Sequence, residues 1–387
     1  MSQARARPAR PSKMPEAPEG SAEHALYQER SVARASSLGG MSGASRGSWI
    51  RPCGLFAALV LFFGWYATVQ LRRYPVGAQQ AAAIYLCFLL LIVLYLAPGF
   101  AISRAWLVLK FRGIRGAAAS AAIFLLPYLI YCTGTGDFRL TAFAKLAALA
   151  ALPLGLFAVV PVKSPRRLNW QDALVLLWLF LPVVFHLISG IWNVPVNLDF
   201  MARLFLVGVG AWSFLIQRGI GTGPAGSVVR AGYIDDAGYD FTISTPILRD
   251  ALVSFAGFIA IALPLGFALR FIAWNPKYRG LGDLLSNYLT ILLFVAITEE
   301  LFFRGLFQNL LETTLGSRHA AQAIASVLFG LSHIQHAPFP NWRYVTLATV
   351  AGWFYGSAYR RHRSLMASAG VHALVDTLWR TWFTLPG

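Results

Sequence analysis

Residues 291–306 read ILLFVAITEELFFRGL, which places two adjacent glutamates and an arginine inside an otherwise apolar run. An ionisable side chain at the centre of a membrane-spanning helix costs roughly 2.5–3.5 kcal/mol, so such residues are candidate functional groups by default. Glu300 and Arg304 are four residues apart, with the acid first, which favours an ion pair on a helix. Glu299 is rotated about 100° from Glu300, so we expect its partner on another helix.

This run is one of many apolar runs along the chain. Hydrophobic residues make up 57% of the 387 residues and charged residues only 13%, too few to cover a water-soluble body of this size. Because about 20 apolar residues span a bilayer as a helix, we predict an all-α, polytopic transmembrane bundle of about 10–11 helices. The predicted spans are 52–70, 79–101, 116–133, 140–162, 171–193, 197–217, 247–273, 284–306, 320–338, 343–359 and 364–384.

Composition divides the chain into three parts. Residues 1–50 are rich in Ala, Pro, Ser, Gly and Arg with almost no large apolar side chains, so we predict a disordered basic tail. Residues 51–245 form an N-terminal transmembrane region to which the sequence assigns no role, and residues 246–387 form a domain that holds the acidic motif. The loop 218–246 predicts a small hairpin around Asp235-Asp236-Ala237-Gly238.

The charge of the chain predicts its orientation. The 33 Lys and Arg residues against 16 Asp and Glu give a formal net charge of +17, and the cations lie mostly in the links between apolar runs. This placement favours anionic lipid as a partner and does not indicate nucleic acid. We predict an integral protein of the cytoplasmic (inner) membrane with a cytoplasmic N-terminus, which puts most basic links on one side. The basic residues that predict this orientation lie in the links 104–115, 163–167, 218 and 360–363. Those of 270–279 fall on the other side.

The three cysteines, Cys53, Cys87 and Cys132, are far apart and each lies in apolar sequence. This spacing supports neither a disulfide framework nor a CxxC metal site. We predict that all three are buried as small hydrophobic side chains.

Two further motifs put imidazoles into later apolar runs. FGLSH ends in His333, and HALVD begins with His372 and ends with Asp376. His372 and Asp376 share a helix face, where a carboxylate can fix the tautomer and orientation of an imidazole. The predicted polar pocket consists of Glu299, His333, His372 and Asp376, with Glu300 and Arg304 as a supporting brace.

A pocket of this composition can activate water. A carboxylate removed from bulk water is a stronger general base, one imidazole can help to orient the water, and the other can stabilise an oxyanion. These functions suit the hydrolysis of an amide bond. The same side chains could instead hold a divalent metal ion such as zinc, yet the sequence has no HExxH motif and no defined ligand spacing. We therefore favour direct activation by glutamate and histidine.

The three motifs EELFFR, FGLSH and HALVD resemble the EExxxR, FxxxH and Hxxx(N/D) motifs of the CPBP family of intramembrane proteases. That family includes the Rce1-type CAAX prenyl endopeptidases and the Abi proteins linked to bacteriocin processing and self-immunity. The resemblance covers residues 280–385 and implies that Glu299 and His333 activate water while His372 and Asp376 form the oxyanion pair. Because an ionised Asp cannot donate a hydrogen bond, Asp376 must either be protonated or orient His372.

The resemblance also implies the kind of substrate. A membrane-associated peptide or protein is expected, with a prenylated CAAX protein and a bacteriocin leader as equally open candidates. Glu299 lies in the cytoplasmic half of its predicted span, so we expect the pocket to open to the cytoplasm.

Three other interpretations of the pocket stay open. It could be a structural polar network that fixes the register of neighbouring helices. It could relay protons in a transporter, although the first six spans have no acid at their centres. It could also belong to a catalytically inactive immunity or scaffold protein, which only activity data would separate from an enzyme.

Overall fold

Helices make up most of the structure, a computed structural model that describes residues 50–72, 74–164, 167–220 and 237–384. Within these ranges two short strands, β1 (Ala273–Trp274) and β2 (Phe383–Thr384), pair antiparallel. The all-α fold class is thus confirmed. The predicted disordered tail and most of the hairpin predicted around Asp235 and Asp236 lie outside the described residues.

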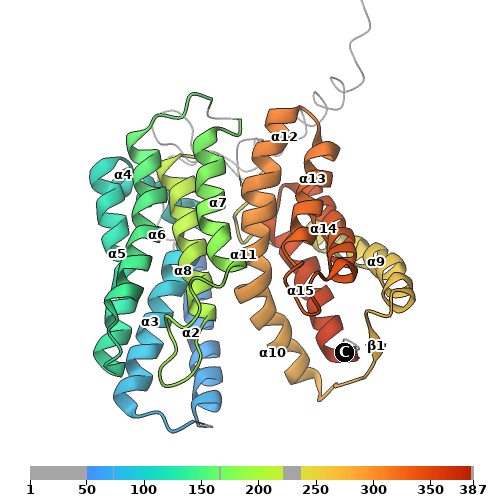
Figure 1. The fold of residues 1–387 in the computed structure, drawn as a ribbon, viewed down its shortest axis with the longest axis horizontal. Coiled ribbons are helices and arrows are strands. Elements are labelled where there is room, and N and C mark those ends of the chain that lie inside the picture. The colour runs from blue at the N-terminus through green and yellow to red at the C-terminus, as the bar shows by residue number, and fades with distance from the viewer. Residues whose placement is uncertain (1–49, 73, 165–166, 221–236, 385–387) are drawn as a thin grey trace, which may run out of the picture. The chain divides into compact units, whose positions relative to one another are not determined.

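The helices form an N-terminal and a C-terminal group, which lie side by side in Figure 1. The N-terminal group consists of α2 (Ile50–Leu71), α3 (Ala78–Leu96), a 3-10 turn η2 (Ala97–Gly99), α4 (Ala101–Phe111), α5 (Ile114–Thr135), α6 (Leu140–Val159), α7 (Trp170–Val184), α8 (Phe200–Ala211) and π-helix η3 (Trp212–Gln217). The C-terminal group consists of α9 (Thr245–Ala268), α10 (Leu281–Ile291), π-helix η5 (Leu292–Ala296), α11 (Ile297–Glu300), π-helix η6 (Leu301–Gln308), α12 (Asn309–Leu315), α13 (Arg318–Leu331), α14 (Trp342–His362) and α15 (Leu365–Trp382).

Helices occupy all of the predicted spans, with differences in their limits. The span predicted at 320–338 is wrong at its end, because α13 ends at Leu331 and turns follow. The span predicted at 171–193 is wrong in its second half, because α7 ends at Val184 and turns follow up to residue 199. The basic link after residue 101 contains a further helix, α4. The span predicted at 284–306 is part of a longer continuous helix, Leu281–Leu315.

Among the described residues, six helices are long and apolar enough to cross a membrane. They are Ala78–Gly99, Ile114–Thr135, Leu140–Val159, Phe200–Gln217, Thr245–Ala268 and Leu281–Leu315, and shorter apolar helices lie at Cys53–Val69 and Trp170–Val184. This set fits the membrane bundle that the hydrophobic pattern predicts.

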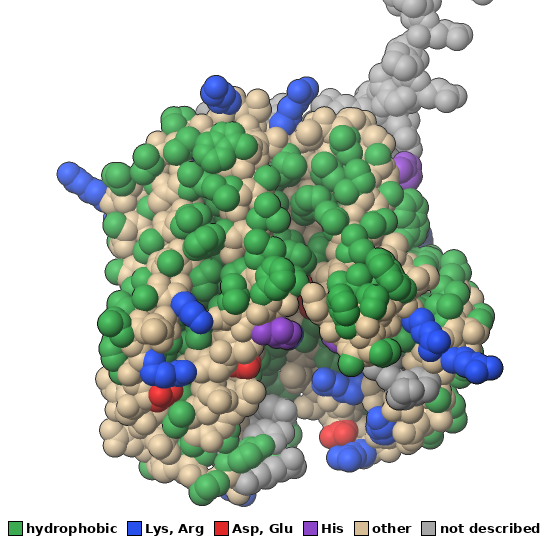
Figure 2. Space-filling view, viewed as in Figure 1, with side chains coloured by type: hydrophobic (Ala, Val, Ile, Leu, Met, Phe, Trp, Pro, Cys, Tyr) green, Lys and Arg blue, Asp and Glu red, His purple; other side chains and the backbone are tan. Residues whose placement is uncertain are grey.

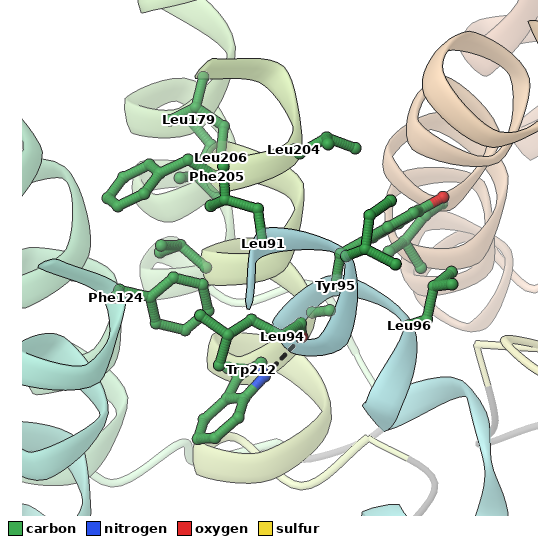
Figure 3. Close-up of a cluster of buried hydrophobic side chains, with 14 of the residues drawn as sticks. Leu91, Leu94, Tyr95, Leu96, Phe124, Leu179, Leu204, Phe205, Leu206 and Trp212 are labelled. Atoms are coloured by element: carbon green, nitrogen blue, oxygen red, sulfur yellow. Dashed lines mark hydrogen bonds between the residues drawn. The ribbon is translucent and has the colours of Figure 1, made fainter. Parts of the chain in front are cut away.

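The interior of the N-terminal group is packed with aromatic and aliphatic side chains (Figure 3). The Phe124 ring meets those of Phe205 and Trp212 edge to face, with centroids 5.8 and 5.6 Å apart. Trp212 Nε1 donates to Leu94 O at 2.9 Å, which satisfies the indole N–H away from water. Gly208 permits this packing, because a Cβ there would lie 2.9 Å from the Phe124 ring.

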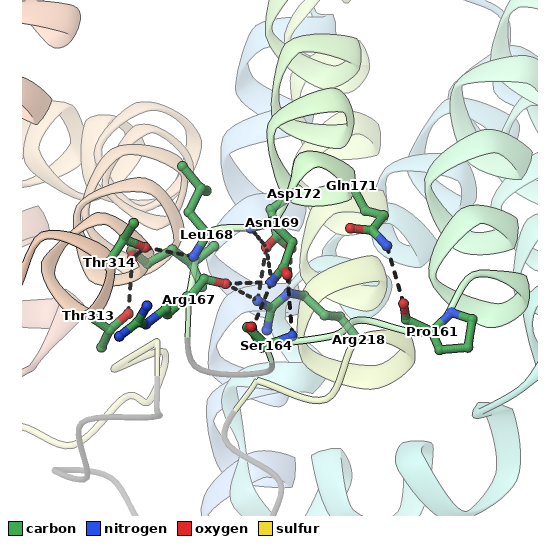
Figure 4. Close-up of polar contacts among 11 residues, drawn as sticks. Pro161, Ser164, Arg167, Leu168, Asn169, Gln171, Asp172, Arg218, Thr313 and Thr314 are labelled. Carbon is green, nitrogen blue, oxygen red and sulfur yellow. Dashed lines mark hydrogen bonds and ion pairs between the residues drawn. The ribbon is translucent and has the colours of Figure 1, made fainter.

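Hydrogen bonds tie the N-terminal group to the helix that carries the two glutamates. The Tyr95 hydroxyl donates to Leu293 O at 3.3 Å, from within the N-terminal core. At another point, Leu168 N donates to Thr314 Oγ1 at 2.8 Å (Figure 4). The loop that holds Leu168 is fixed in turn by a buried ion pair between Asp172 and Arg218. The N-terminal region therefore helps to position the long helix of the acidic motif.

Both glutamates of the acidic motif lie between two π-helical segments. The π-helix η5 precedes α11, which ends with Glu299 and Glu300, and η6 follows directly. Such segments widen a helix by one residue per turn and occur frequently at functional sites.

The cysteines of the described chain are all free, as predicted. Cys87 and Cys132 are buried, but the prediction for Cys53 is wrong, because this side chain is exposed on α2. Exposure follows because only one face of α2 packs against the core: Leu59 and Phe63 are buried, whereas Leu61 and Trp65 on the same helix are exposed.

Candidate active site

Glu300 is the centre of a buried polar cluster. Its Oε1 accepts from Arg304 Nη1 at 3.0 Å, in the predicted i, i+4 pair, and both side chains are 0% exposed. The hydroxyl of Ser368 on α15 donates to the other carboxylate oxygen. His372 Nδ1, also on α15, lies 2.9 Å from Glu300 Oε1. One carboxylate thus joins α11, η6 and α15, and no part of it faces water.

Arg304 is held from a third direction by α14. Its Nη2 donates to Gly352 O at 2.9 Å, and its guanidinium lies 4.7 Å from the centroid of the Phe329 ring. A side chain at position 352 would crowd this contact, because a Cβ there would lie 3.2 Å from Nη2 and 3.0 Å from Ser326 Cα. The buried cation is therefore both ion-paired and hydrogen-bonded, as burial of a charge requires.

His372 is oriented mainly by Glu300, a partner that the sequence analysis did not assign to it. Asp376 Oδ2 lies 3.6 Å from the opposite ring nitrogen, Nε2, and Glu299 Oε2 lies 4.0 Å from that same atom. The ring of Tyr355 stacks on the imidazole, with centroids 4.6 Å apart and planes inclined by 14°. His372 Nε2 therefore points between two carboxylates, while Nδ1 is engaged by a third.

Glu299 and Glu300 have opposite surroundings, as the rotation between adjacent helix positions predicts. The Glu299 side chain is 30% exposed and lines the cavity described below, whereas Glu300 is sealed behind it. Asp376 is 36% exposed and lines the same cavity. These two carboxylates are reachable by a substrate and by water.

His333 lies just beyond the end of α13, in a ring of aromatic side chains. Its Nδ1 lies 2.8 Å from Phe329 O, and since a carbonyl only accepts, Nδ1 carries the proton and donates. In the neutral imidazole Nε2 is then the acceptor. Tyr344 packs against the ring at a centroid distance of 4.7 Å. The structure shows no direct hydrogen bond between the described side chains of His333 and Glu299.

A cavity of about 880 Å³ brings the four predicted pocket residues together. Glu299, His333, His372 and Asp376 all line it. The opposite wall comes from α7 and α8 of the N-terminal region, through Leu179, Phe180, Val183, Leu206, Val207 and Gly210. Figure 2 shows the hollow between the two groups of helices, with Lys, Arg and His side chains at its margin. The N-terminal region is thus part of the site.

The open end of the cavity lies at the ends of α7, α9 and α15. Exposed residues that line the cavity there are His186, Lys277 and Arg380. His186 follows α7, Lys277 lies in the link after α9, and Arg380 is in the last turn of α15. The basic links at 163–167 and 360–363 come before α7 and before α15, at the other end of the bundle. These exposed lining residues therefore lie at the end of the bundle away from these two basic links. The long helix extends to Leu315, which puts Glu299 near its middle, and the cavity runs from there toward the opposite end.

The described side chains do not form a metal site. Within the described ranges no group of three or more His, Cys, Asp or Glu side chains is arranged to hold a metal ion. His372 Nδ1 is bonded to Glu300 and His333 Nδ1 to a backbone carbonyl, which leaves Nε2 as the remaining nitrogen of each ring.

Three residues of the site were missed by the sequence analysis. Ser368 precedes His372 by four residues, so helical spacing could have found it. Tyr355 and Phe180 carry no comparable signal, because an aromatic residue in an apolar run is ordinary. Only packing brings them to the cavity.

The fold and the buried carboxylate–histidine cluster define the class as a helical membrane protein with an intramembrane site. Residues 282–378 match the family model described as Type II CAAX prenyl endopeptidase Rce1-like. The resemblance drawn from the three motifs is thus confirmed: this part of the chain is similar to the Rce1-like CAAX protease family. No curated protein and no solved structure matched the chain in the other two comparisons.

Proposed function

We propose that the chain hydrolyses a peptide bond with a water molecule activated by Glu299 and His333. The observation that supports this most is the division of labour between the adjacent glutamates. Glu300 is buried and bonded to Arg304 and His372, whereas Glu299 is exposed to the cavity and forms no ion pair with a described Lys or Arg side chain. A site built only for structure would not leave a carboxylate open to a substrate.

In the proposed reaction Glu299 takes a proton from the water as its oxygen bonds to the scissile carbonyl carbon. His333 Nε2, the acceptor nitrogen, co-orients that water. His372 donates from Nε2 to the oxyanion in its imidazolium form, in which both ring nitrogens carry a proton and Glu300 accepts from Nδ1–H. When the carbon–nitrogen bond breaks, Glu299 returns the proton to the leaving amine. Asp376 lies beside His372 Nε2 and orients it, since an ionised carboxylate cannot donate.

The proposed substrate is a membrane-associated peptide or protein, with prenylated CAAX proteins and bacteriocin leaders as the classes that the family offers. The apolar wall from α7 and α8 supports a substrate that enters from the bilayer. We test the reaction in membranes incubated in H₂¹⁸O, comparing wild type with Glu299→Gln at equal abundance. New peptide C-termini that take up ¹⁸O only with the wild type would establish hydrolysis. Equal peptide pools would favour a transporter or an inactive immunity protein, and loss of the termini with a chelator would favour a metal ion.

Phe180 gives the N-terminal region a testable part in this function. Its ring stacks on that of Phe302 with centroids 5.4 Å apart and planes inclined by 17°. Truncation in Phe180→Ala removes apolar contact from the cavity wall, so we expect kcat/KM to fall roughly 10–100-fold, mainly through KM. Leu177→Ala is the control, because this side chain lies on the same helix and is 53% exposed. Equal kinetics for the two variants would remove α7 from the substrate site.

We propose an inner-membrane location with a cytoplasmic N-terminus and anionic lipid at the basic end of the bundle. Exposed cations such as Lys110 and Arg112 support this orientation. The cavity would then open on the other side of the membrane. In a Cys53→Ser background, an impermeant maleimide on intact cells should label Lys277→Cys and leave Arg112→Cys unlabelled. The reverse pattern would place the N-terminus outside and the opening in the cytoplasm.

A further inference from the structure

Tyr355 lines the cavity beside His372. The residue is 1% exposed, it lines the cavity, and its ring stacks on the imidazole at 4.6 Å. Its hydroxyl makes no hydrogen bond to any residue that the structure describes, whereas that of nearby Ser332 donates to Phe329 O at 2.7 Å. A phenol hydroxyl of a cavity-lining residue that has no hydrogen-bond partner among the described residues is free to donate to a bound substrate.

The proposed reaction lacks a second donor for the oxyanion. Glu299 and Asp376 are acceptors when ionised, and the backbone N–H groups of α14 and α15 near the site are used within these helices. His372 Nε2 is the donor already assigned. A phenol O–H is a neutral donor, and a second one at an oxyanion adds to the first.

We propose that Tyr355 is a further catalytic residue, whose O–H donates to the oxyanion of the tetrahedral intermediate together with His372 Nε2–H. This inference rests on the proposed function. The phenol keeps its proton throughout: the carbonyl π pair moves to oxygen when water adds and returns when the carbon–nitrogen bond breaks. Tyr355 therefore needs no co-reactant.

The Tyr355 ring is held in one orientation before substrate arrives. His372 covers one face, and the Phe329 ring meets it edge to face at 5.7 Å with an angle of 72°. The Arg304 guanidinium lies 5.4 Å from the ring centroid. A donor fixed in this way loses little entropy in the transition state, which is what an oxyanion site requires.

The test compares Tyr355→Phe with wild type on the peptide whose new terminus takes up ¹⁸O. Phenylalanine keeps the stacking on His372 and removes only the hydroxyl, so we expect kcat to fall about 10²–10³-fold with KM little changed. Tyr355→Leu, which also loses the ring, should be no more active than Tyr355→Phe. Tyr288→Phe is the control, because this tyrosine belongs to the same part of the chain but does not line the cavity. It should stay within about threefold of wild type.

A binding measurement keeps the proposal testable if Tyr355→Phe is unstable in turnover assays. An aldehyde made from the same peptide forms a tetrahedral hydrate, so its affinity should fall at least about tenfold in Tyr355→Phe. The affinity for the uncleaved peptide should be the same in Glu299→Gln with and without Tyr355→Phe. Wild-type kcat in Tyr355→Phe, with Glu299→Gln inactive, would overturn the role of Tyr355 and leave the proposed function standing. Equal inactivity of wild type and Glu299→Gln would overturn both.

Discussion

Glu299→Gln is expected to lower kcat of the purified protein roughly 10²–10⁴-fold, the usual contribution of a general base. Glutamine has nearly the same shape, so the cavity should keep its form while losing the atom that accepts the proton from water. Glu299 is 30% exposed and bears no buried ion pair, so its replacement should not unfold the protein. The measurement is the rate of peptide cleavage in detergent or lipid, with thermal unfolding recorded on the same sample.

The matched control for Glu299→Gln is Asp283→Asn. Asp283 belongs to the same continuous helix, Leu281–Leu315, but it is exposed and does not line the cavity. The control removes the same charge from the same helix, so it should retain wild-type cleavage. Full turnover in Glu299→Gln would contradict the mechanism, whereas equal losses in both variants would trace the effect to the charge of the helix.

Glu300→Ala is expected to have the largest effect on stability. It leaves the Arg304 guanidinium, 0% exposed, without its carboxylate, which typically costs about 3–5 kcal/mol for a buried pair. It also frees Ser368 and His372 Nδ1. Cleavage should be lost as well, because His372 no longer has a fixed tautomer and orientation. Thermal unfolding and cleavage are measured on one preparation.

A double variant separates the charge from the packing at this position. Glu300→Leu with Arg304→Met replaces the pair by apolar side chains, and it should be more stable than Glu300→Ala because no buried charge is left alone. Arg249→Ala is the control for loss of an ion pair, since its partner contact with Asp250 is at the surface and its side chain is 80% exposed. An unchanged unfolding midpoint in Glu300→Ala would show that Glu300 does not hold the cluster together.

The sequence alone determined the local features of the site. The i, i+4 spacing of Glu300 and Arg304 predicted their ion pair, and the rotation of Glu299 predicted that it faces elsewhere. These features depend only on the geometry of one helix, which sequence spacing fixes. Helix spans were predicted for the same reason, because membrane-length apolar runs are a property of contiguous residues.

The tertiary structure decided everything that depends on which helices face each other. It assigned the Nδ1 of His372 to Glu300, where the spacing on α15 had indicated Asp376. It brought Phe180 from the N-terminal region and Tyr355 from α14 to the cavity, and it placed the exposed cavity residues at the end of the bundle away from the basic links at 163–167 and 360–363. No periodicity records these contacts, because packing between helices joins residues far apart in sequence and depends on the fit of whole surfaces.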